Sequence, residues 1–194
     1  MKEQTTAIRH ARIPLVPVAE LPPYMQRLTE IFGTVPASMQ AYAHRPEIAA
    51  AFLALENAVL SGGAVELPIK AGVAYVVSRD NGCDYCAAHV GGLMKGAGIS
   101  DEQLACMISP TPQTGNPTLD SALAYARLAA RRAATDSSLA DLSKHFSTEQ
   151  IVELTCVVGL FSWTNHVHDA LGIPIEDRFE KLGAHRIRPA QETS

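Results

Sequence analysis

One stretch dominates this 194-residue sequence: Ser78-Arg79-Asp80-Asn81-Gly82-Cys83-Asp84-Tyr85-Cys86-Ala87-Ala88-His89. Two cysteines three residues apart lie on one face of a helix. A helix that begins at Cys83 places both thiols near the positive end of its dipole, which favours the thiolate form. Asp80 or Asn81 is a suitable cap for that helix, and Gly82 gives the backbone room at the turn. We therefore predict a reactive thiol pair at a helix N-terminus.

A histidine completes this group. His89 follows Cys86 by three residues, so its ring is expected near the second thiol. It is a candidate base, or a cation that stabilises a thiolate. In thiol redox chemistry one cysteine attacks and the other closes a disulfide. The predicted catalytic residues are Cys83, Cys86 and His89.

Zinc binding and simple packing are the alternatives for this cysteine pair. Structural zinc needs four ligands, usually from two separated clusters, and the sequence has no second Cys-x-x-Cys and no His-x-x-x-His. Three ligands along one helix would also form an awkward tetrahedron. We therefore expect no metal and no cofactor. Buried packing stays open as the other alternative, because free cysteines are often buried.

A second polar group, Asn165-His166-Val167-His168-Asp169, lies inside a predicted helix. His166 and His168 are two residues apart and point to different faces, so they cannot share a metal without further ligands. We interpret this group mainly as polar packing or a contact between subunits, with a metal site as the weaker alternative. Cys106 and Cys156 lie in apolar helical surroundings and are expected to pack in the core.

Composition and charge limit the class of protein. The chain is 47% apolar and 19% charged with a net charge of -4, which suits one soluble globular domain. It has no basic stripe with interleaved aromatic residues, so we expect no nucleic-acid partner. It also has no secretory signal and no apolar run that could span a bilayer, so we expect no membrane contact and a cytoplasmic location. Four cysteines in such a chain are not a disulfide framework.

Helix start and stop signals predict an all-α fold. Prolines suit the first turn of three helices, and Ser100 and Ser147 each begin a capping box. The expected helices cover residues 36–44, 46–60, 68–79, 83–98, 100–108, 119–134 and 147–171, with one more short helix after Ile175. No stretch has the alternation typical of a strand between hairpin turns. The predicted parts of the chain are an N-terminal proline-punctuated arm, an all-helical domain and a polar tail, at residues 1–23, 24–183 and 184–194.

The sequence from about residue 34 to residue 179 resembles the AhpD-like, carboxymuconolactone decarboxylase superfamily. The resemblance is carried by His44-Arg45-Pro46-Glu47-Ile48-Ala49, by the motif Ser-Arg-x-Asn-Gly-Cys-x-Tyr-Cys ending at Cys86, and by Phe161-Ser162-Trp163-Thr164-Asn165 with Asp169. The last stretch looks like the peroxidase-related branch. The resemblance implies a single-domain AhpD-like helical bundle that assembles into trimers or hexamers, and a thiol peroxidase or disulfide reductase activity.

The resemblance also implies roles for the two thiols. Cys86 would attack a peroxide and become a sulfenic acid, and Cys83 would then condense with it to a disulfide that a reducing thiol partner reopens. The substrate would be a small peroxide or disulfide, with His89 assisting.

Two positions depart from the family pattern. A histidine is expected four residues after the second cysteine, where this chain has Val90, and a glutamate twelve residues before the first, where it has Ala71. Tyr75 or Ser78 shares a helical stripe with Ala71 and is an alternative lining residue. Two other functions therefore stay open. One is a non-redox, decarboxylase-like enzyme using Arg79 and His89, and the other is a catalytically weak redox-sensing scaffold.

Overall fold

The computed structural model describes residues 11–190, and within that range the protein is helical without any strand. The predicted all-α fold is confirmed. In chain order the elements are η1 (Val18–Glu20), α1 (Pro23–Gln26), α2 (Leu28–Phe32), α3 (Ala37–Tyr42), α4 (Pro46–Leu60), α5 (Leu67–Asp80), α6 (Asp84–Gly96), α7 (Asp101–Met107), α8 (Pro117–Ala130), α9 (Asp136–Leu142), α10 (Thr148–Leu171), α11 (Asp177–Leu182) and η2 (Ala184–Arg186).

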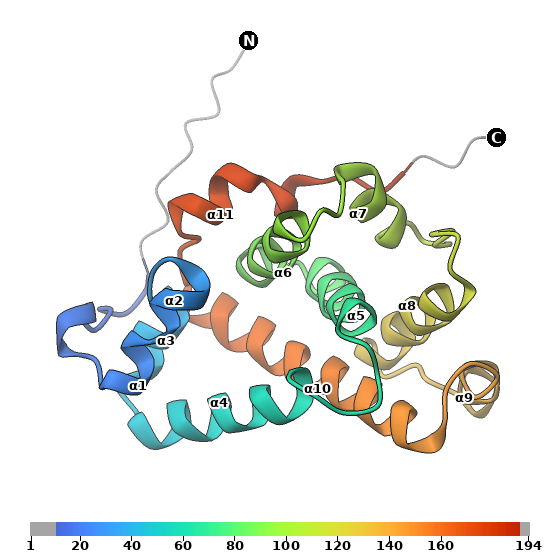
Figure 1. Ribbon diagram of the computed structural model, residues 1–194, viewed down its shortest axis with the longest axis horizontal. Helices are drawn as coiled ribbons and strands as arrows, with labels where there is room; N and C mark the ends of the chain where they lie inside the picture. The colour runs from blue at the N-terminus through green and yellow to red at the C-terminus, as the bar shows by residue number, and fades with distance from the viewer. Residues whose placement is uncertain (1–10, 191–194) are drawn as a thin grey trace, which may run out of the picture.

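Helix α5 lies at the centre of the bundle. It packs against α6, α8 and α10, and Figure 1 shows it in green with α10 crossing beneath it. Its residues Val73 to Val77 are all buried, so the helix is enclosed on several sides rather than on one stripe. The segments on either side of α5 therefore have fixed positions, and one of them is the turn that leads to the two cysteines.

The capping signals placed several helices well. Helix α4 has the predicted bounds, and capping boxes open α7 at Ser100 and α10 at Ser147 as predicted. Helix α9 was not predicted. It opens with a capping box between Thr135 and Ser138, in which serine replaces the more familiar glutamate or glutamine at the third position.

The predicted arm is described from residue 11 onward, and residues 1–10 and 191–194 lie outside the described residues. Residues 11–17 pack against the helices of their own chain. Arg12 N donates to Leu171 O at 2.8 Å, and Val16 N donates to Gln40 O at 3.2 Å. Near the other end of the described range, Ala190 N donates to Ala105 O at 3.2 Å. The three predicted parts of the chain stay predictions.

A buried lysine fixes the connection between α4 and α5. The Lys70 side chain has no exposed surface, and its ammonium donates to Val59 O at 2.9 Å and to Gly62 O. It also forms an ion pair with Glu153 of α10. A buried charge is tolerated only when it is paired and hydrogen-bonded, as it is here. Lys70 thereby joins the start of α5 to α10.

Two adjacent glycines allow α6 to approach its neighbours closely. A Cβ on Gly91 would lie 2.6 Å from the Cβ of Ala184 and 2.8 Å from the Tyr75 ring. A Cβ on Gly92 would lie 2.6 Å from the Phe179 ring. Helix α6 therefore contacts α5, α11 and η2 at a distance that side chains at these two positions would prevent. No helix within residues 11–190 combines the length and apolarity needed to cross a membrane.

We predict that Gly91→Ala lowers the free energy of unfolding by about 1–3 kcal/mol, because the added methyl group overpacks the α6 contact. The matched control is Gly159→Ala, in the interior of α10, where an added Cβ meets nothing within 4 Å. There the same change should raise the free energy of unfolding by about 0.5–1 kcal/mol. Urea denaturation measures both. Equal effects of the two substitutions would contradict this account of the α6 packing.

Candidate functional site

The turn that carries the first cysteine is fastened to α10 by a chain of side-chain hydrogen bonds. Asn81 Nδ2 donates to Asn165 Oδ1 at 2.9 Å, and Asn165 Nδ2 donates to Ser78 Oγ at 3.1 Å. Ser78 Oγ in turn donates to Ala74 O at 2.8 Å. Asn165 is 2% exposed, so its amide depends on these partners. It therefore joins the end of α5, the turn and α10.

Two charged residues of the motif hold the same turn from other sides. The Arg79 guanidinium donates to backbone carbonyls in the segment 184–187, among them Ile187 O at 2.8 Å. The Asp80 carboxylate accepts from Arg127 at 2.7 Å and from Arg131 at 2.9 Å. Arg79 therefore anchors the segment after α11, and Asp80 anchors α8.

The predicted cap of α6 by Asp80 or Asn81 is wrong. The N-cap residue is Cys83 itself, and no side chain caps the helix. Both predicted caps have tertiary partners instead, in α8 and in α10. Gly82 has φ of +73°, which supports the prediction that the turn needs a glycine.

The cysteine pair is buried, and both thiols are free. The prediction that Cys106 and Cys156 pack in the core is wrong, because Cys106 is partly exposed and Cys156 lies on the exposed side of α10. Cys86 Sγ lies 3.1 Å from Nδ1 of His168 and 3.8 Å from Thr164 Oγ1. His168 and Thr164 both belong to α10. The other ring nitrogen of His168, Nε2, lies 2.7 Å from the hydroxyl of Tyr42. The imidazole that contacts the thiol pair is therefore that of His168.

The structure places His89 beside a carboxylate. Its Nε2 lies 2.5 Å from Glu176 Oε2, and its ring stacks on Phe179 with centroids 4.0 Å apart. Glu176 also accepts from the Tyr85 hydroxyl at 3.1 Å and from Ala37 N at 2.6 Å. Its pKa lies below the ordinary value, because these bonds, that of His89 above all, outweigh the effect of burial. The catalytic role of His89 stays a prediction.

Sequence reasoning did not single out His168. The sequence predicts polar packing or a contact between subunits for the segment Asn165–Asp169, and helical spacing indicates only which of its residues share a face. Burial distinguishes the two histidines, because His168 is buried in the structure and His166 is exposed. Only the way α10 packs against α3 and α6 shows that His168 reaches the thiols.

The two thiols share one negative charge. The hydrogen bond from Cys86 lowers the pKa of Cys83 to about 6 against the effect of burial, with a further contribution from His168. The same hydrogen bond, together with burial, raises the pKa of Cys86. Burial lowers the pKa of His168, so its ring is neutral near pH 7. The resting pair therefore carries its charge on Cys83 and its proton on Cys86.

A small pocket of about 190 Å³ is lined by only one of the two cysteines of the pair. Cys86, His168, His89 and Glu56 belong to its wall, and Cys83 does not. The rest of the wall is mainly apolar and aromatic: Leu28, Phe32, Pro36, Ser38, Met39, Phe52, Leu53, Leu60, Tyr85, Val90, Leu93, Leu160, Phe161 and Thr164. Burial raises the pKa of Glu56 to about 6, so the pocket contains a carboxyl group that is partly protonated near neutral pH.

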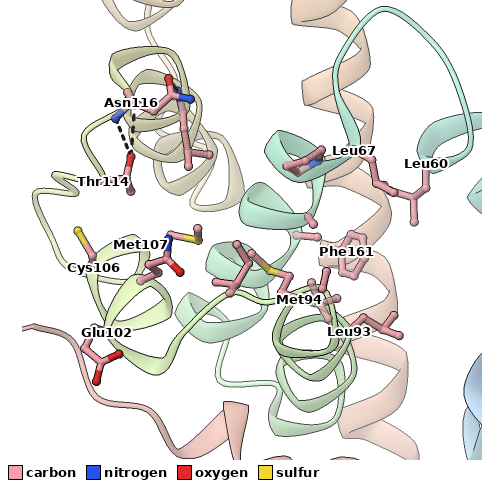
Figure 2. Close-up of a pocket in the computed structure, with 18 of the residues that line it drawn as sticks. Leu60, Leu67, Leu93, Met94, Glu102, Cys106, Met107, Thr114, Asn116 and Phe161 are labelled. Atoms are coloured by element: carbon pink, nitrogen blue, oxygen red, sulfur yellow. Dashed lines mark hydrogen bonds between the residues drawn. The ribbon is translucent and has the colours of Figure 1, made fainter.

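The positions that depart from the family pattern lie around a second, larger pocket of about 700 Å³. Ala71 belongs to its wall, and Val90 belongs to both walls. Figure 2 shows this pocket, with Leu67 and Phe161 on one side and Cys106 on the other. Its wall is mainly apolar, with Glu102, Gln103, Gln113, Thr114 and Asn116 as its polar residues. Ala71 supplies no acid at the position where the family pattern has a glutamate.

Neither predicted substitute for the missing glutamate lines the thiol pocket. Tyr75 is fully buried and its hydroxyl donates to Ala184 O at 2.7 Å. Burial raises the pKa of Tyr75 to about 12, which makes it a poor proton donor. Ser78 is committed to Ala74 and Asn165. Among the described residues that line this pocket, Glu56 is the one with a carboxyl group.

Comparison with known proteins agrees with the sequence resemblance. Residues 46–128 match the carboxymuconolactone decarboxylase family model, a segment that runs from α4 into α8 and contains both thiols of the pair. The recognition of this family from the cysteine motif is confirmed. Among curated proteins, none matches the chain in sequence.

Solved structures of similar shape cover most of the chain. The AhpD core of a peroxidase-related protein from Ralstonia eutropha JMP134 has 20% identity and a TM-score of 0.79, over 87% of this chain and 94% of that one. A peroxidase-related protein from Silicibacter sp. TM1040 has 25% identity and a TM-score of 0.72, over 87% and 93%. The debrominase Bmp8 has 18% identity and a TM-score of 0.78, over 93% and 98%. The fold is therefore AhpD-like.

We predict that one thiolate per chain forms with a midpoint near pH 6. A lowered thiol pKa means that the anion is present above that pH and is lost below it. The ultraviolet absorbance of the thiolate, followed from pH 4 to pH 9 in a Cys106→Ser/Cys156→Ser background, measures this titration. Cys86→Ala should raise the midpoint toward the ordinary thiol value of about 8.5, because the side-chain donor to Cys83 is removed. Wild-type titration only near that ordinary value would contradict the shared charge.

Proposed function

We propose that this chain, which carries an AhpD-like fold and a carboxymuconolactone decarboxylase family match, is a thiol-dependent peroxidase or disulfide reductase. The observation that supports this most is the order of groups at the small pocket. Cys86 belongs to the pocket wall and contacts His168, whereas Cys83 lies within reach behind it. In this proposal Cys86 attacks the substrate and Cys83 closes the disulfide.

The first step oxidises Cys86. Neutral His168 accepts the Cys86 proton through Nδ1 as the sulfur attacks the terminal peroxide oxygen. The O–O bond breaks, the sulfur keeps one oxygen as a sulfenic acid, and the leaving alkoxide takes a proton to become an alcohol. The hydrogen bond between His168 Nε2 and Tyr42 holds the ring in place during this transfer.

Glu56 is the proposed donor of the alcohol proton. It lies in the pocket wall, and its raised pKa keeps part of it protonated near neutral pH. It would therefore supply the acid that the family pattern places at the position of Ala71. Glu176 would hold two other residues of the wall in place, because it bonds both His89 and Tyr85.

The second step forms the disulfide. The Cys83 thiolate attacks the sulfur of the Cys86 sulfenic acid, the S–O bond breaks, and the oxygen leaves as water after taking up a proton. With a disulfide substrate, Cys86 would instead attack one substrate sulfur to form a mixed disulfide and release the other half as a thiolate. Cys83 would then attack the Cys86 sulfur and release the second half as a thiolate. A reducing thiol partner then returns both cysteines to the resting state. The proposal includes a cytoplasmic location and assembly into trimers or hexamers.

Reductive dehalogenation is the second candidate. The debrominase Bmp8, whose structure was solved with 2,3,4-tribromopyrrole, is similar over 93% of this chain. The pocket wall offers flat rings around Cys86, including Phe32, Phe52 and Phe161. Two thiols would supply the two electrons that replace a carbon–bromine bond with a carbon–hydrogen bond, with bromide as the leaving group. Bromide release from such a pyrrole would distinguish this reaction from peroxide reduction.

The non-redox alternative has lost one of its residues. Its candidate acid–base groups were Arg79 and His89, but the Arg79 guanidinium donates to backbone carbonyls of residues 184, 185 and 187. Arg79 is also absent from the walls of both pockets described above. A redox-sensing scaffold stays compatible with the same disulfide and would differ in turning over slowly.

We predict that one equivalent of peroxide removes two free thiols from the reduced protein in the Cys106→Ser/Cys156→Ser background. Cys86→Ser should lose none. Cys83→Ser should stop at a sulfenic acid that a dimedone probe captures, because the thiol that resolves it is gone. Thiol counting and mass spectrometry measure all three proteins. No thiol loss in the parent, or equal dimedone labelling of the two serine variants, would contradict the proposed roles.

We predict that His168→Gln slows peroxide-dependent thiol loss at pH 7 by about 10²–10⁴-fold, the usual contribution of a positioned base. His166→Gln is the matched control, since it lies on the exposed side of the same helix. It should leave the rate within twofold. Stopped-flow measurement of the single turnover gives both values. An equal rate in His168→Gln and the control would remove His168 from the mechanism.

A further inference from the structure

Three buried donor atoms meet beside the small pocket. The sulfurs of Cys83 and Cys86 and a ring nitrogen of His168 all lie within 4.8 Å of one another. We propose that the reduced protein binds one zinc ion through these three residues, with the fourth coordination position open to the pocket. This site goes beyond the proposed redox function, because it needs neither a peroxide nor an electron donor.

The spacing of the three donors suits a tetrahedral zinc ion. Bond lengths of about 2.3 Å to sulfur and about 2.0 Å to nitrogen place the ligand atoms of a tetrahedron roughly 3.5–3.8 Å apart. Cys86 Sγ and His168 Nδ1 are now 3.1 Å apart, and Cys83 lies within the same small volume. A change of less than about 1 Å brings the Cys86–His168 distance to tetrahedral spacing, and the Cys83 sulfur lies within 4.8 Å of both atoms.

The third ligand comes from a separate helix. The cysteine motif alone offers three ligands along one helix, Cys83, Cys86 and His89, which form an awkward tetrahedron. In the structure His168 approaches from α10, so the ligands converge from two directions. Its Nε2 is held by the Tyr42 hydroxyl at 2.7 Å. Metal-binding histidines commonly have such a partner on the second nitrogen, which fixes the ring and the tautomer.

The chemistry of the donors selects the ion. Two thiolates and a neutral imidazole suit a soft or borderline cation and do not suit Mg²⁺ or Ca²⁺, which prefer oxygen ligands. Two thiolate charges balance Zn²⁺, so the complex is neutral in a place where an unpaired charge would be costly. Two sulfurs and one nitrogen with an open position also match a known catalytic zinc pattern. The pocket has room for a water molecule or a substrate atom at that position.

Zinc binding and thiol oxidation exclude each other. Zinc coordination uses the sulfur lone pairs that would attack a substrate, and a disulfide offers no thiolate to the ion. The zinc-loaded protein should therefore consume peroxide only after a chelator removes the metal. Since this claim concerns the reduced resting protein, it stands or fails separately from the peroxidase reaction.

The experiment measures zinc directly by competition with a chromophoric chelator, using reduced full-length protein in the Cys106→Ser/Cys156→Ser background. We expect one Zn²⁺ per chain. Cobalt in place of zinc should give thiolate-to-cobalt charge-transfer absorption and the visible bands of a tetrahedral ion. The cobalt spectrum needs no substitution in the site, so it does not depend on how the variants fold. The protein oxidised to its disulfide should bind neither ion.

The variants locate the site. His168→Ala and Cys86→Ser should weaken zinc binding by more than about 100-fold, and Tyr42→Phe by about 10-fold, the range seen when the partner of a ligating histidine is removed. His166→Gln should leave the affinity unchanged. No bound zinc in the reduced parent, or zinc and a tetrahedral cobalt spectrum retained in full by His168→Ala, would overturn the proposal. Zinc failure with intact peroxide-dependent thiol loss would leave the peroxidase proposal standing.

Discussion

The buried amide of Asn165 is the contact on which the site depends. It bonds Asn81 in the turn and Ser78 at the end of α5, so α5, the turn and α10 meet at one amide. This amide is buried and depends on these two partners for its hydrogen bonds. Leaving such a buried group unpaired costs about 1–3 kcal/mol, so the elements favour a single arrangement. In that arrangement His168, one helical turn further along α10, lies against Cys86. The position of His168 therefore depends on the hydrogen bonds of Asn165, a residue that does not line the pocket.

The electrostatics of the site follow from the same packing. Burial disfavours charge on His168 and on Glu56, and the hydrogen bond within the cysteine pair concentrates one negative charge on Cys83. The pocket wall therefore contains neutral His168, partly protonated Glu56 and the thiol of Cys86, whereas the thiolate of Cys83 lies outside the wall. This arrangement supports the proposed order, in which Cys86 attacks first and Cys83 second. The same lone pairs would hold zinc, so one donor set supports two exclusive states.

Much of the fold could be predicted because its signals are local. Pro46 in the first turn placed the start of α4, and the Ser147 capping box placed the start of α10. Helix α9 was missed because its box uses Ser138 where a glutamate or glutamine is the usual signal. The turn at Gly82 was also predicted from a local signal, the glycine itself, and the residue has a positive φ in the structure.

The site was predictable only in part because its contacts are tertiary. The motif identified Cys83 and Cys86, but helical spacing favoured His89, whose ring bonds Glu176 from the segment before α11. Asp80 was expected as a helix cap, but its carboxylate accepts hydrogen bonds from Arg127 in α8 and from Arg131 just after α8. Sequence spacing identifies neighbours on one helix. It does not identify which helix supplies the next contact.

The most direct test of this account is a nitrogen NMR titration of the His168 ring in the reduced protein. We expect a neutral ring at pH 7, with a pKa below the ordinary histidine value because the ring is buried. Its nitrogen shifts should change in Cys86→Ser and stay the same in Cys106→Ser. An ordinary histidine titration that is indifferent to Cys86→Ser would contradict the central claim that α10 brings this base to the thiol pair.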